Sequence, residues 1–319
     1  MEIVGIGNAL MDVIAFVDEA FAPAHGFHNN AVAHLDRERL DGVLFDLRDP
    51  VTSAGGGAAN AVRVASMLGS RAAYVGCVGR DGRGDRFRED LQVDGVDPIL
   101  SFADEPTGVY CALVRPEGGR TLLVCPGAAL RLTDCAPPDA VFQKGAILYL
   151  EGFLLGNRGY FFSCLSRARE AGMEIALDLG SHSLVRAQRD FILEILPEYC
   201  DILFANQDEF EALCGLSLRE GLGLLGSESL TTVVKLAEKG AVWSRGGISY
   251  ESPVRAIAPV DETGAGDAFA AGFLVGRSLG LPPERCLRVG NRMAEEVLNV
   301  PGLGVDSERL RKAAGDLGV

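Results

Sequence analysis

The sequence predicts an α/β fold: a doubly wound, mainly parallel sheet flanked by helices, with a small β lid. Short β-rich runs alternate with helix-length stretches along the 319 residues, which is typical of βαβ units. Two segments, about 13–35 and 107–125, break this rhythm and are expected to form the lid. Because 48% of the residues are hydrophobic, the chain can bury a large core. We therefore expect one domain over residues 1–319.

The expected elements follow in chain order. Helices are expected over 57–68 and 83–93, between strand-like runs. The runs TGVYCALV and RTLLVCPG predict a hairpin, because Pro116, Glu117, Gly118 and Gly119 between them are turn residues. The run ESPVRAIAPV is also strand-like. The strands of the parallel sheet are expected, in order, in EIVGIG, RAAYVGCVG, AILYLEG, EIALDLG, DILFAN and TTVVKLA.

Composition narrows the class of function. The 44 acidic residues outnumber the 30 Lys and Arg residues, and a net charge of -14 argues against nucleic-acid and anionic-membrane partners. The N-terminus lacks a basic region and polar residues interrupt every apolar run, so we expect a cytoplasmic protein. The eight cysteines have no CxxC spacing and mostly lie in apolar runs, which predicts reduced core residues. His25, His28 and His34 are spaced too irregularly to favour a metal site.

One motif, DETGAGDAFAAGF at residues 261–273, places a carboxylate at the start of an apolar helix. Its glycines let the backbone approach a ligand, and the free N–H groups of a helix start bind anions such as phosphate. Asp267 would repel a resting phosphate, but it could take a proton from a substrate hydroxyl during phosphoryl transfer. Gly264, Ala265 and Gly266 would then hold the developing charge. The alternative is an acidic residue that merely caps the helix.

Two N-terminal motifs indicate a site for hydroxyl groups. Asn8 and Asp12 follow the first strand, and open α/β sheets bind ligands at the carboxyl ends of their strands. The run AGGGAANAV places Gly55 and Gly56 ahead of a helix that contains Asn60. Each motif alone also fits an ordinary turn. Together they favour a polyhydroxyl ligand.

Further polar residues end two of the later strands. Asn206 ends DILFAN, and Glu209 follows it at the spacing of a capping box. The same pair could organise a hydrated Mg²⁺ ion, which needs few carboxylates, so both roles stay open. Lys235 ends TTVVK and precedes a turn at Gly240. It is either a solvated charge, which the sequence alone favours, or a cation near a nucleotide.

These motifs, in this order and at these separations, resemble the PfkB group of carbohydrate kinases, the ribokinase and adenosine kinase family. The resemblance runs almost from end to end, and the GAGD block is its most specific part. The pieces LDRERL, YLEGFLLG and ILFAN are most similar to bacterial sugar and adenosine kinases of this group. The motifs that carry the resemblance are NALMD, GGGAAN, ANQDE, VVKLAEKGA and DETGAGDAFAAGF.

The resemblance implies a ribokinase-like fold and an ATP-dependent kinase that phosphorylates a primary hydroxyl of a sugar or, as a narrower alternative, of adenosine or another nucleoside. Asp267 would be the catalytic base and residues 264–266 the anion hole. Asn206 and Glu209 would match the NxxE motif that organises Mg²⁺, with Lys235 and Gly240 beside the nucleotide. Asp261 matches a position that binds K⁺ in relatives, and the lid allows a homodimer. The substrate contacts implied by the resemblance are Asn8, Asp12, Gly55, Gly56, Asn60 and Glu151.

Several positions depart from the family pattern and leave the nucleotide affinity and the acceptor open. Glu262 stands where a small residue is usual, Ala237 replaces a glycine of the nucleotide loop, and Gly57 replaces a larger residue. The stretches GGRTLLVCPGAAL and DLGSHSLV, the latter with Ser181 and His182, also differ from the usual forms.

Parts of the sequence are also compatible with two other classes of protein. A dinucleotide-dependent oxidoreductase is disfavoured, because no GxGxxG motif followed by a distant acidic residue occurs in the N-terminal unit. A non-catalytic sugar-sensing module could keep the same fold. The intact GAGD motif with Asp267 argues against it.

Overall fold

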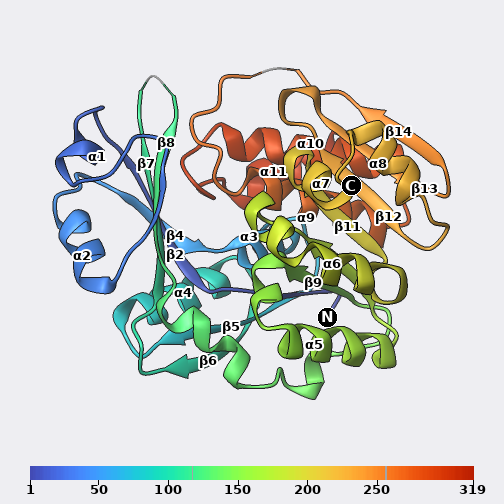
Figure 1. The fold of residues 1–319 in the computed structure, drawn as a ribbon, viewed down its shortest axis with the longest axis horizontal. Coiled ribbons are helices and arrows are strands. Elements are labelled where there is room, and N and C mark those ends of the chain that lie inside the picture. Colours follow the sequence, from blue (N-terminus) through green and yellow to red (C-terminus); the bar gives the residue numbers. More distant parts are fainter. Residues whose placement is uncertain (117, 256) are drawn as a thin grey trace.

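The computed structural model describes residues 1–116, 118–255 and 257–319, in which two sheets and their flanking helices form the fold (Figure 1). The larger sheet has nine strands in the order β14-β13-β12-β11-β10-β9-β1-β5-β6. Neighbours from β6 to β12 are parallel, and β13 and β14 add an antiparallel edge, so the predicted mainly parallel sheet is confirmed. Its strands are β1 (Ile3–Ile6), β5 (Ala72–Gly79), β6 (Asp97–Ala103), β9 (Ile147–Glu151), β10 (Glu174–Asp178), β11 (Ile202–Asn206), β12 (Thr231–Lys235), β13 (Ala241–Arg245) and β14 (Ile248–Ser252).

Helices cover both faces of the larger sheet. Side chains of successive strand residues point to opposite faces, so one strand contributes apolar side chains to the core on each side. In β9, for example, Tyr149 belongs to the hydrophobic core on one face of the sheet, whereas Leu148 and Leu150 belong to the core on the other face. The first face packs against α3 (Gly57–Met67), α4 (Gly82–Val93), α9 (Ala265–Ser278), α10 (Pro283–Leu298) and α11 (Ser307–Gly315). The second packs against α5 (Arg158–Ala171), α6 (His182–Tyr199), α7 (Gln207–Cys214) and α8 (Leu218–Leu224).

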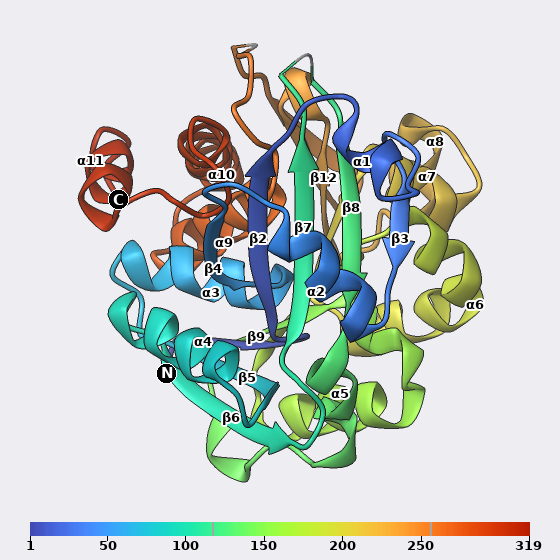
Figure 2. The same cartoon turned by 90° about the vertical axis from the view of Figure 1, so that its left-hand side faces the viewer.

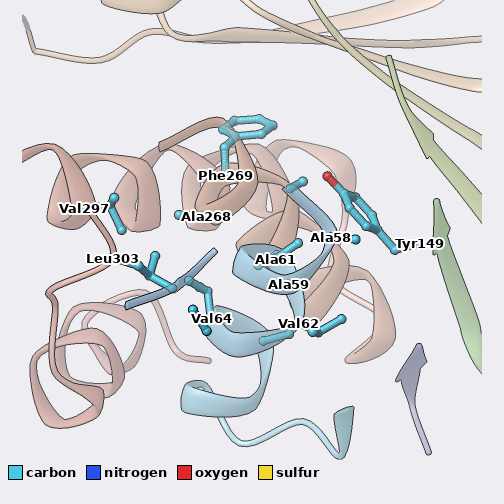
Figure 3. Packing of buried hydrophobic residues seen from close by; sticks show 14 of the residues in the cluster. Ala58, Ala59, Ala61, Val62, Val64, Tyr149, Ala268, Phe269, Val297 and Leu303 are labelled. Atoms are coloured by element: carbon cyan, nitrogen blue, oxygen red, sulfur yellow. The ribbon is translucent and has the colours of Figure 1, made fainter. Parts of the chain in front are cut away.

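Small side chains bring α3 and α9 close together above the sheet. Ala58, Ala61 and Val64 of α3 are buried in the same cluster as Ala268 and Phe269 of α9 (Figure 3). Alanines allow a close approach between the two helices, because they add little volume to the contact. The starts of α3 and α9 therefore lie near the same edge of the sheet.

The smaller sheet contains strands from both segments that were predicted to form a lid, and we call it the lid sheet; its five strands have the order β3-β8-β7-β2-β4. β7 and β8 pair antiparallel, so the predicted hairpin is present; Glu117 of its predicted turn lies outside the described residues. Figure 2 shows α1 (Phe21–Ala24) and α2 (Arg37–Phe45) in front of this sheet. The lid strands are β2 (Leu10–Phe16), β3 (Val32–His34), β4 (Val51–Gly55), β7 (Gly108–Val114) and β8 (Arg120–Cys125). Four 3₁₀ helices complete the described elements: η1 (Gly127–Asp134), η2 (Asp139–Val141), η3 (Gly152–Gly156) and η4 (Ala237–Lys239).

Two expectations need correction here. Residues 10–12 and 51–55 also belong to the lid sheet, so Asp12, which was predicted only to follow the first strand, lies within the lid strand β2. The polar Asp12 interrupts an apolar run and so conceals the strand in the sequence. The stretch ESPVRAIAPV is not one strand: β14 ends at Ser252, and residues 253–255 and 257–260 carry no strand. Pro253 and Pro259 cannot donate to a sheet.

The cysteines are free thiols, and seven of the eight are buried as predicted. Cys135 is the exception and is exposed. Among the described helices, none combines the length and the apolar composition that crossing a membrane would require.

Candidate active site

Polar side chains converge where the carboxyl ends of the central strands meet the lid sheet. Glu151, Asp178, Asn206 and Lys235 are the last residues of β9, β10, β11 and β12, which are neighbours in the sheet. The start of α9 lies at the same edge, because Gly266 is next to the Lys235 ammonium group. Such an edge is where open α/β sheets place their ligands.

The α9 helix starts without a side-chain cap. Gly264 is its N-cap residue with a left-handed φ of 78°, and no side chain of the described residues accepts from the first-turn N–H groups. The N–H of Ala265 donates to the carbonyl oxygen of Glu262 at 3.3 Å, so Ala265 is not the free donor that was predicted.

Asp267, the third residue of α9, is partly buried, and its Oδ2 accepts a hydrogen bond of 3.1 Å from Nδ2 of Asn60. Burial, helped by the charge of Asp178, raises the pKa of Asp267 to about 7. A carboxylate that titrates there can exchange a proton near neutral pH.

Gly57 leaves open space beside Asp267. A Cβ atom at residue 57 would lie 3.4 Å from Oδ1 of Asp267 and 3.6 Å from Oε2 of Glu151. A longer side chain would therefore project toward both carboxylates. Glycine at position 57, where the family pattern has a larger residue, therefore adds no side chain between Asp267 and Glu151.

Glu151 holds backbone groups of two segments. Its carboxylate accepts from the N–H of Asn8 at 2.6 Å and from the N–H of Ala58, at the start of α3, at 3.1 Å. Burial nevertheless raises the pKa of Glu151 to about 7. The predicted site residues Asn8 and Glu151 are thus adjacent, and Glu151 ties the loop after β1 to α3.

Asp12 faces the same region from the lid. Gly55 and Gly56 are required here, because a Cβ at Gly55 would lie 2.0 Å from Cγ of Asp12 and one at Gly56 would lie 2.2 Å from the carbonyl oxygen of Asn8. Burial raises the pKa of Asp12 to about 7, with a further contribution from Asp267. No described residue donates to the buried Oδ1 of Asn60, which leaves that oxygen free to accept from a ligand hydroxyl.

Lys235 is not a solvated charge, contrary to the interpretation that the sequence alone favoured. Its ammonium group pairs with Asp178 at 2.8 Å, and Tyr149 donates to the same Asp178 oxygen at 2.9 Å. Burial opposes the lysine charge, but Asp178 and Glu209 together raise the pKa of Lys235. Asp178 was not among the predicted site residues, although it is an acidic residue directly after the apolar run EIAL, which was a usable signal. Nothing in the sequence marks Tyr149.

Asn206 and Glu209 form the capping box that their spacing predicts. Asn206 Oδ1 accepts from the Glu209 N–H at 2.8 Å, and the Glu209 carboxylate accepts from the Asn206 backbone N–H and from its Nδ2, both at 2.9 Å. Burial raises the pKa of Glu209, although Lys235 opposes the shift. The Glu209 carboxyl group therefore lies close enough to Lys235 and Asp178 to interact electrostatically with both.

Two other predicted residues have clear structural partners. Gly240 has a φ of 93°, and a Cβ there would lie 2.0 Å from the carbonyl oxygen of Ser252, so the turn between β12 and β13 requires glycine. Asp261 is buried and accepts from the N–H and hydroxyl of Thr263 and from the N–H of Gly302. It therefore fixes the loop that leads into α9.

Ala237 and Glu262, which depart from the family pattern, also affect the local structure. Ala237 takes a left-handed φ of 51°, a conformation that glycine adopts more readily. Glu262 pairs with Arg120 of the lid strand β8 at 3.1 Å, which links the lid to the loop before α9. Within the described residues, no three His, Cys, Asp or Glu side chains are grouped closely enough to hold a metal ion by themselves.

Comparisons with known proteins agree with this geometry. The chain is 31% identical to a nucleoside kinase of Methanothermobacter thermautotrophicus, over 85% of this chain and 86% of that protein. The crystal structure of adenosine kinase from Sinorhizobium meliloti superposes with a TM-score of 0.88 at 29% identity, covering 99% of this chain and 98% of that one. A probable sugar kinase from Rhizobium etli superposes with a TM-score of 0.89 at 27% identity, with the same coverage.

These comparisons confirm the predicted resemblance, the ribokinase-like fold and the prediction of a phosphotransferase that acts on a sugar or nucleoside alcohol group. The model of the family described as pfkB family carbohydrate kinase matches residues 2–309. Because that match spans nearly the whole chain, the protein belongs to the pfkB family of carbohydrate kinases.

Proposed function

We propose that the protein transfers the γ-phosphoryl group of ATP to the primary hydroxyl of a nucleoside, with Asp267 as the general base. The observation that carries the proposal is Asp267 itself, a carboxylate with a pKa of about 7 in the first turn of a helix that has no side-chain cap. The base removes the proton of the acceptor hydroxyl. The N–H groups of Gly266 and Asp267, for which the described residues provide no acceptor, stabilise the charge of the phosphoryl group in transfer.

The acceptor would bind between the lid and the starts of α3 and α9. Asp12 and the free Oδ1 of Asn60 are positioned to accept hydrogen bonds from ribose hydroxyls. Beside Asp12, the same face of the lid sheet carries Leu10, Tyr110 and Leu122, which are only partly buried. An apolar and aromatic wall suits a flat base better than a free sugar. The relatives named as nucleoside and adenosine kinases support this choice.

The phosphoryl donor would bind along the ends of β11 and β12. Lys235 lies against Gly266 and contributes a positive charge at this place. Its neighbours Asp178, Glu209 and Asp267 are three acidic groups around one lysine, so negative charge is in excess. This donor set fits a hydrated Mg²⁺ ion held mainly by phosphates and water, which would neutralise phosphate charge during transfer. Asp261 remains the proposed position for K⁺.

A substrate screen tests the proposed acceptor. ADP release should be measured with adenosine, inosine, cytidine, aminoimidazole riboside, ribose and fructose, each with and without K⁺. We expect a nucleoside to give the highest kcat/KM. A free sugar as the best acceptor would contradict the nucleoside assignment but not the kinase activity, whereas no turnover with any acceptor would contradict the proposed activity in this substrate class.

Asp267→Asn should abolish most turnover, because the anion-binding helix start survives and only proton removal is lost. A missing general base lowers kcat by about 10²–10⁴-fold. Asp85→Asn, in the exposed first turn of α4, is the matched control and should keep the wild-type kcat. If the folded Asp267→Asn enzyme retains more than about a tenth of the wild-type kcat, far above that range, Asp267 is not the base.

Glu209→Gln should raise the Mg²⁺ concentration needed for half-maximal rate more than it raises the acceptor KM. A glutamine can still complete a capping box, but its neutral amide loses the charge that attracts hydrated Mg²⁺. Glu220→Gln is the matched control, because Glu220 closes an equivalent capping box with Ser217 at the start of α8. Initial rates against free Mg²⁺ at fixed ATP give the answer. Identical Mg²⁺ curves for both variants and the wild type would leave capping as the whole role of Glu209.

A further inference from the structure

Arg63 is a buried charge one turn after Asn60 in α3, and only 5% of the residue is exposed. A buried guanidinium must be paired, since an isolated charge in the interior is costly. Its Nε donates to Asp94 at the end of α4 at 2.6 Å, and its Nη1 donates to the carbonyl oxygen of Ala54. Arg63 therefore links helices of the main body to the lid strand β4.

Ala54 lies in β4, an edge strand of the lid sheet, and none of the described strands pairs with its outward backbone groups. It pairs with Met11 of β2 on one side. On the outer side its N–H donates to Asp90 of α4 at 2.8 Å, and its carbonyl oxygen accepts from Arg63. Two side chains of the body thus take the place of a further strand and fix the end of β4.

The end of β4 in turn contacts two predicted acceptor residues. Gly55 follows Ala54 directly and lies so close to Asp12 that a Cβ would come within 2.0 Å of the carboxyl carbon. Gly56 lies equally close to the carbonyl oxygen of Asn8, at 2.2 Å for a Cβ. A small shift of Ala54 would therefore move the backbone of Gly55 and Gly56, which contacts Asp12 and Asn8.

We propose that Arg63 is a positioning residue for the acceptor: it fixes the end of β4 against Asp12 and supplies the positive charge that faces this carboxylate from α3. The inference rests on the proposed function, because it assigns Asp12 to acceptor binding. Arg63 itself touches neither the acceptor nor the reacting atoms in this scheme.

Because Arg63 is charged, its removal should change how acceptor binding depends on pH. Burial raises the pKa of Asp12, and Asp267 of α9 and Asp261 of the preceding loop raise it further. Arg63 and the side chain of Asn60, both from α3, lower it, and Tyr110 is the titratable neighbour on β7. Without the guanidinium, Asp12 should stay protonated to higher pH. A protonated Asp12 accepts fewer hydrogen bonds, so acceptor binding should need a higher pH than in the wild type.

The test compares Arg63→Gln, Arg63→Lys and a control, Arg86→Gln, in steady-state kinetics from pH 6 to 9. Arg86 also pairs with Asp90, but its side chain is 58% exposed. Arg63→Gln should raise the acceptor KM by about tenfold or more, as expected for a lost buried charge-assisted bond, with a much smaller change in kcat. The rise of kcat/KM with pH should move to higher pH. Arg63→Lys keeps the charge but cannot hold both Asp94 and Ala54, so it should raise KM while leaving the pH profile in place.

Hydrogen exchange of the free protein provides a readout that needs no turnover. Residues 51–56 should exchange faster in both Arg63 variants and at the wild-type rate in Arg86→Gln. If Arg63→Gln does not fold, Arg63→Lys carries the test through its KM and its exchange rates. Unchanged acceptor KM, pH profile and exchange in the folded variants would overturn the role of Arg63. A wild-type enzyme that phosphorylates no acceptor would instead overturn the proposed function, and exchange would still test the link to β4.

Discussion

The site depends on keeping several carboxylates out of water at one edge of a sheet, with few cations to balance them. Asp12, Glu151 and Asp267 each have a pKa raised to about 7, and burial is the largest cause for all three. Lys235 pairs with Asp178 and Arg63 pairs with Asp94, so these two cations offset the raised pKa values of Asp267 and Asp12 only in part. The carboxylates are thus prepared to accept protons and hydroxyl hydrogen bonds, which is the chemistry that phosphorylation of an alcohol requires.

The surrounding fold makes this burial tolerable. Glu151 is held by backbone N–H groups of Asn8 and Ala58, and Asp267 by the Asn60 amide. Glycines let backbone approach the carboxylates where any side chain would collide, most tightly at Gly55 beside Asp12. The close packing of α3 against α9 brings the two helix starts to the same edge of the sheet. Each of these contacts joins segments that are distant in the sequence.

The sequence predicted what depends on local pattern. Alternating strands and helices predicted the parallel sheet, and the glycines around Asp267 predicted an open helix start. The roles of residues that contact distant partners could not be predicted in this way. The burial of Lys235 follows from its pairing with Asp178. The role of Arg63 follows from its contact with Ala54 of the edge strand β4. Asp12 was predicted only to follow the first strand, because this polar residue interrupts the apolar pattern of β2 and conceals that strand in the sequence.

The most direct test of this account is the free energy of unfolding of the free protein from pH 5 to 7, in the wild type and in the isosteric variant Asp12→Asn. A carboxyl group whose folded pKa is raised above its unfolded value binds its proton more tightly in the native state, so its contribution to stability falls as pH rises between the two values. With an ordinary pKa of 3.8 and a folded pKa of about 7, the wild type should lose stability relative to Asp12→Asn across this range. The expected loss is about 1.4 kcal/mol per pH unit. A difference that stays constant, or a wild type that gains stability relative to the variant as pH rises, would contradict the account.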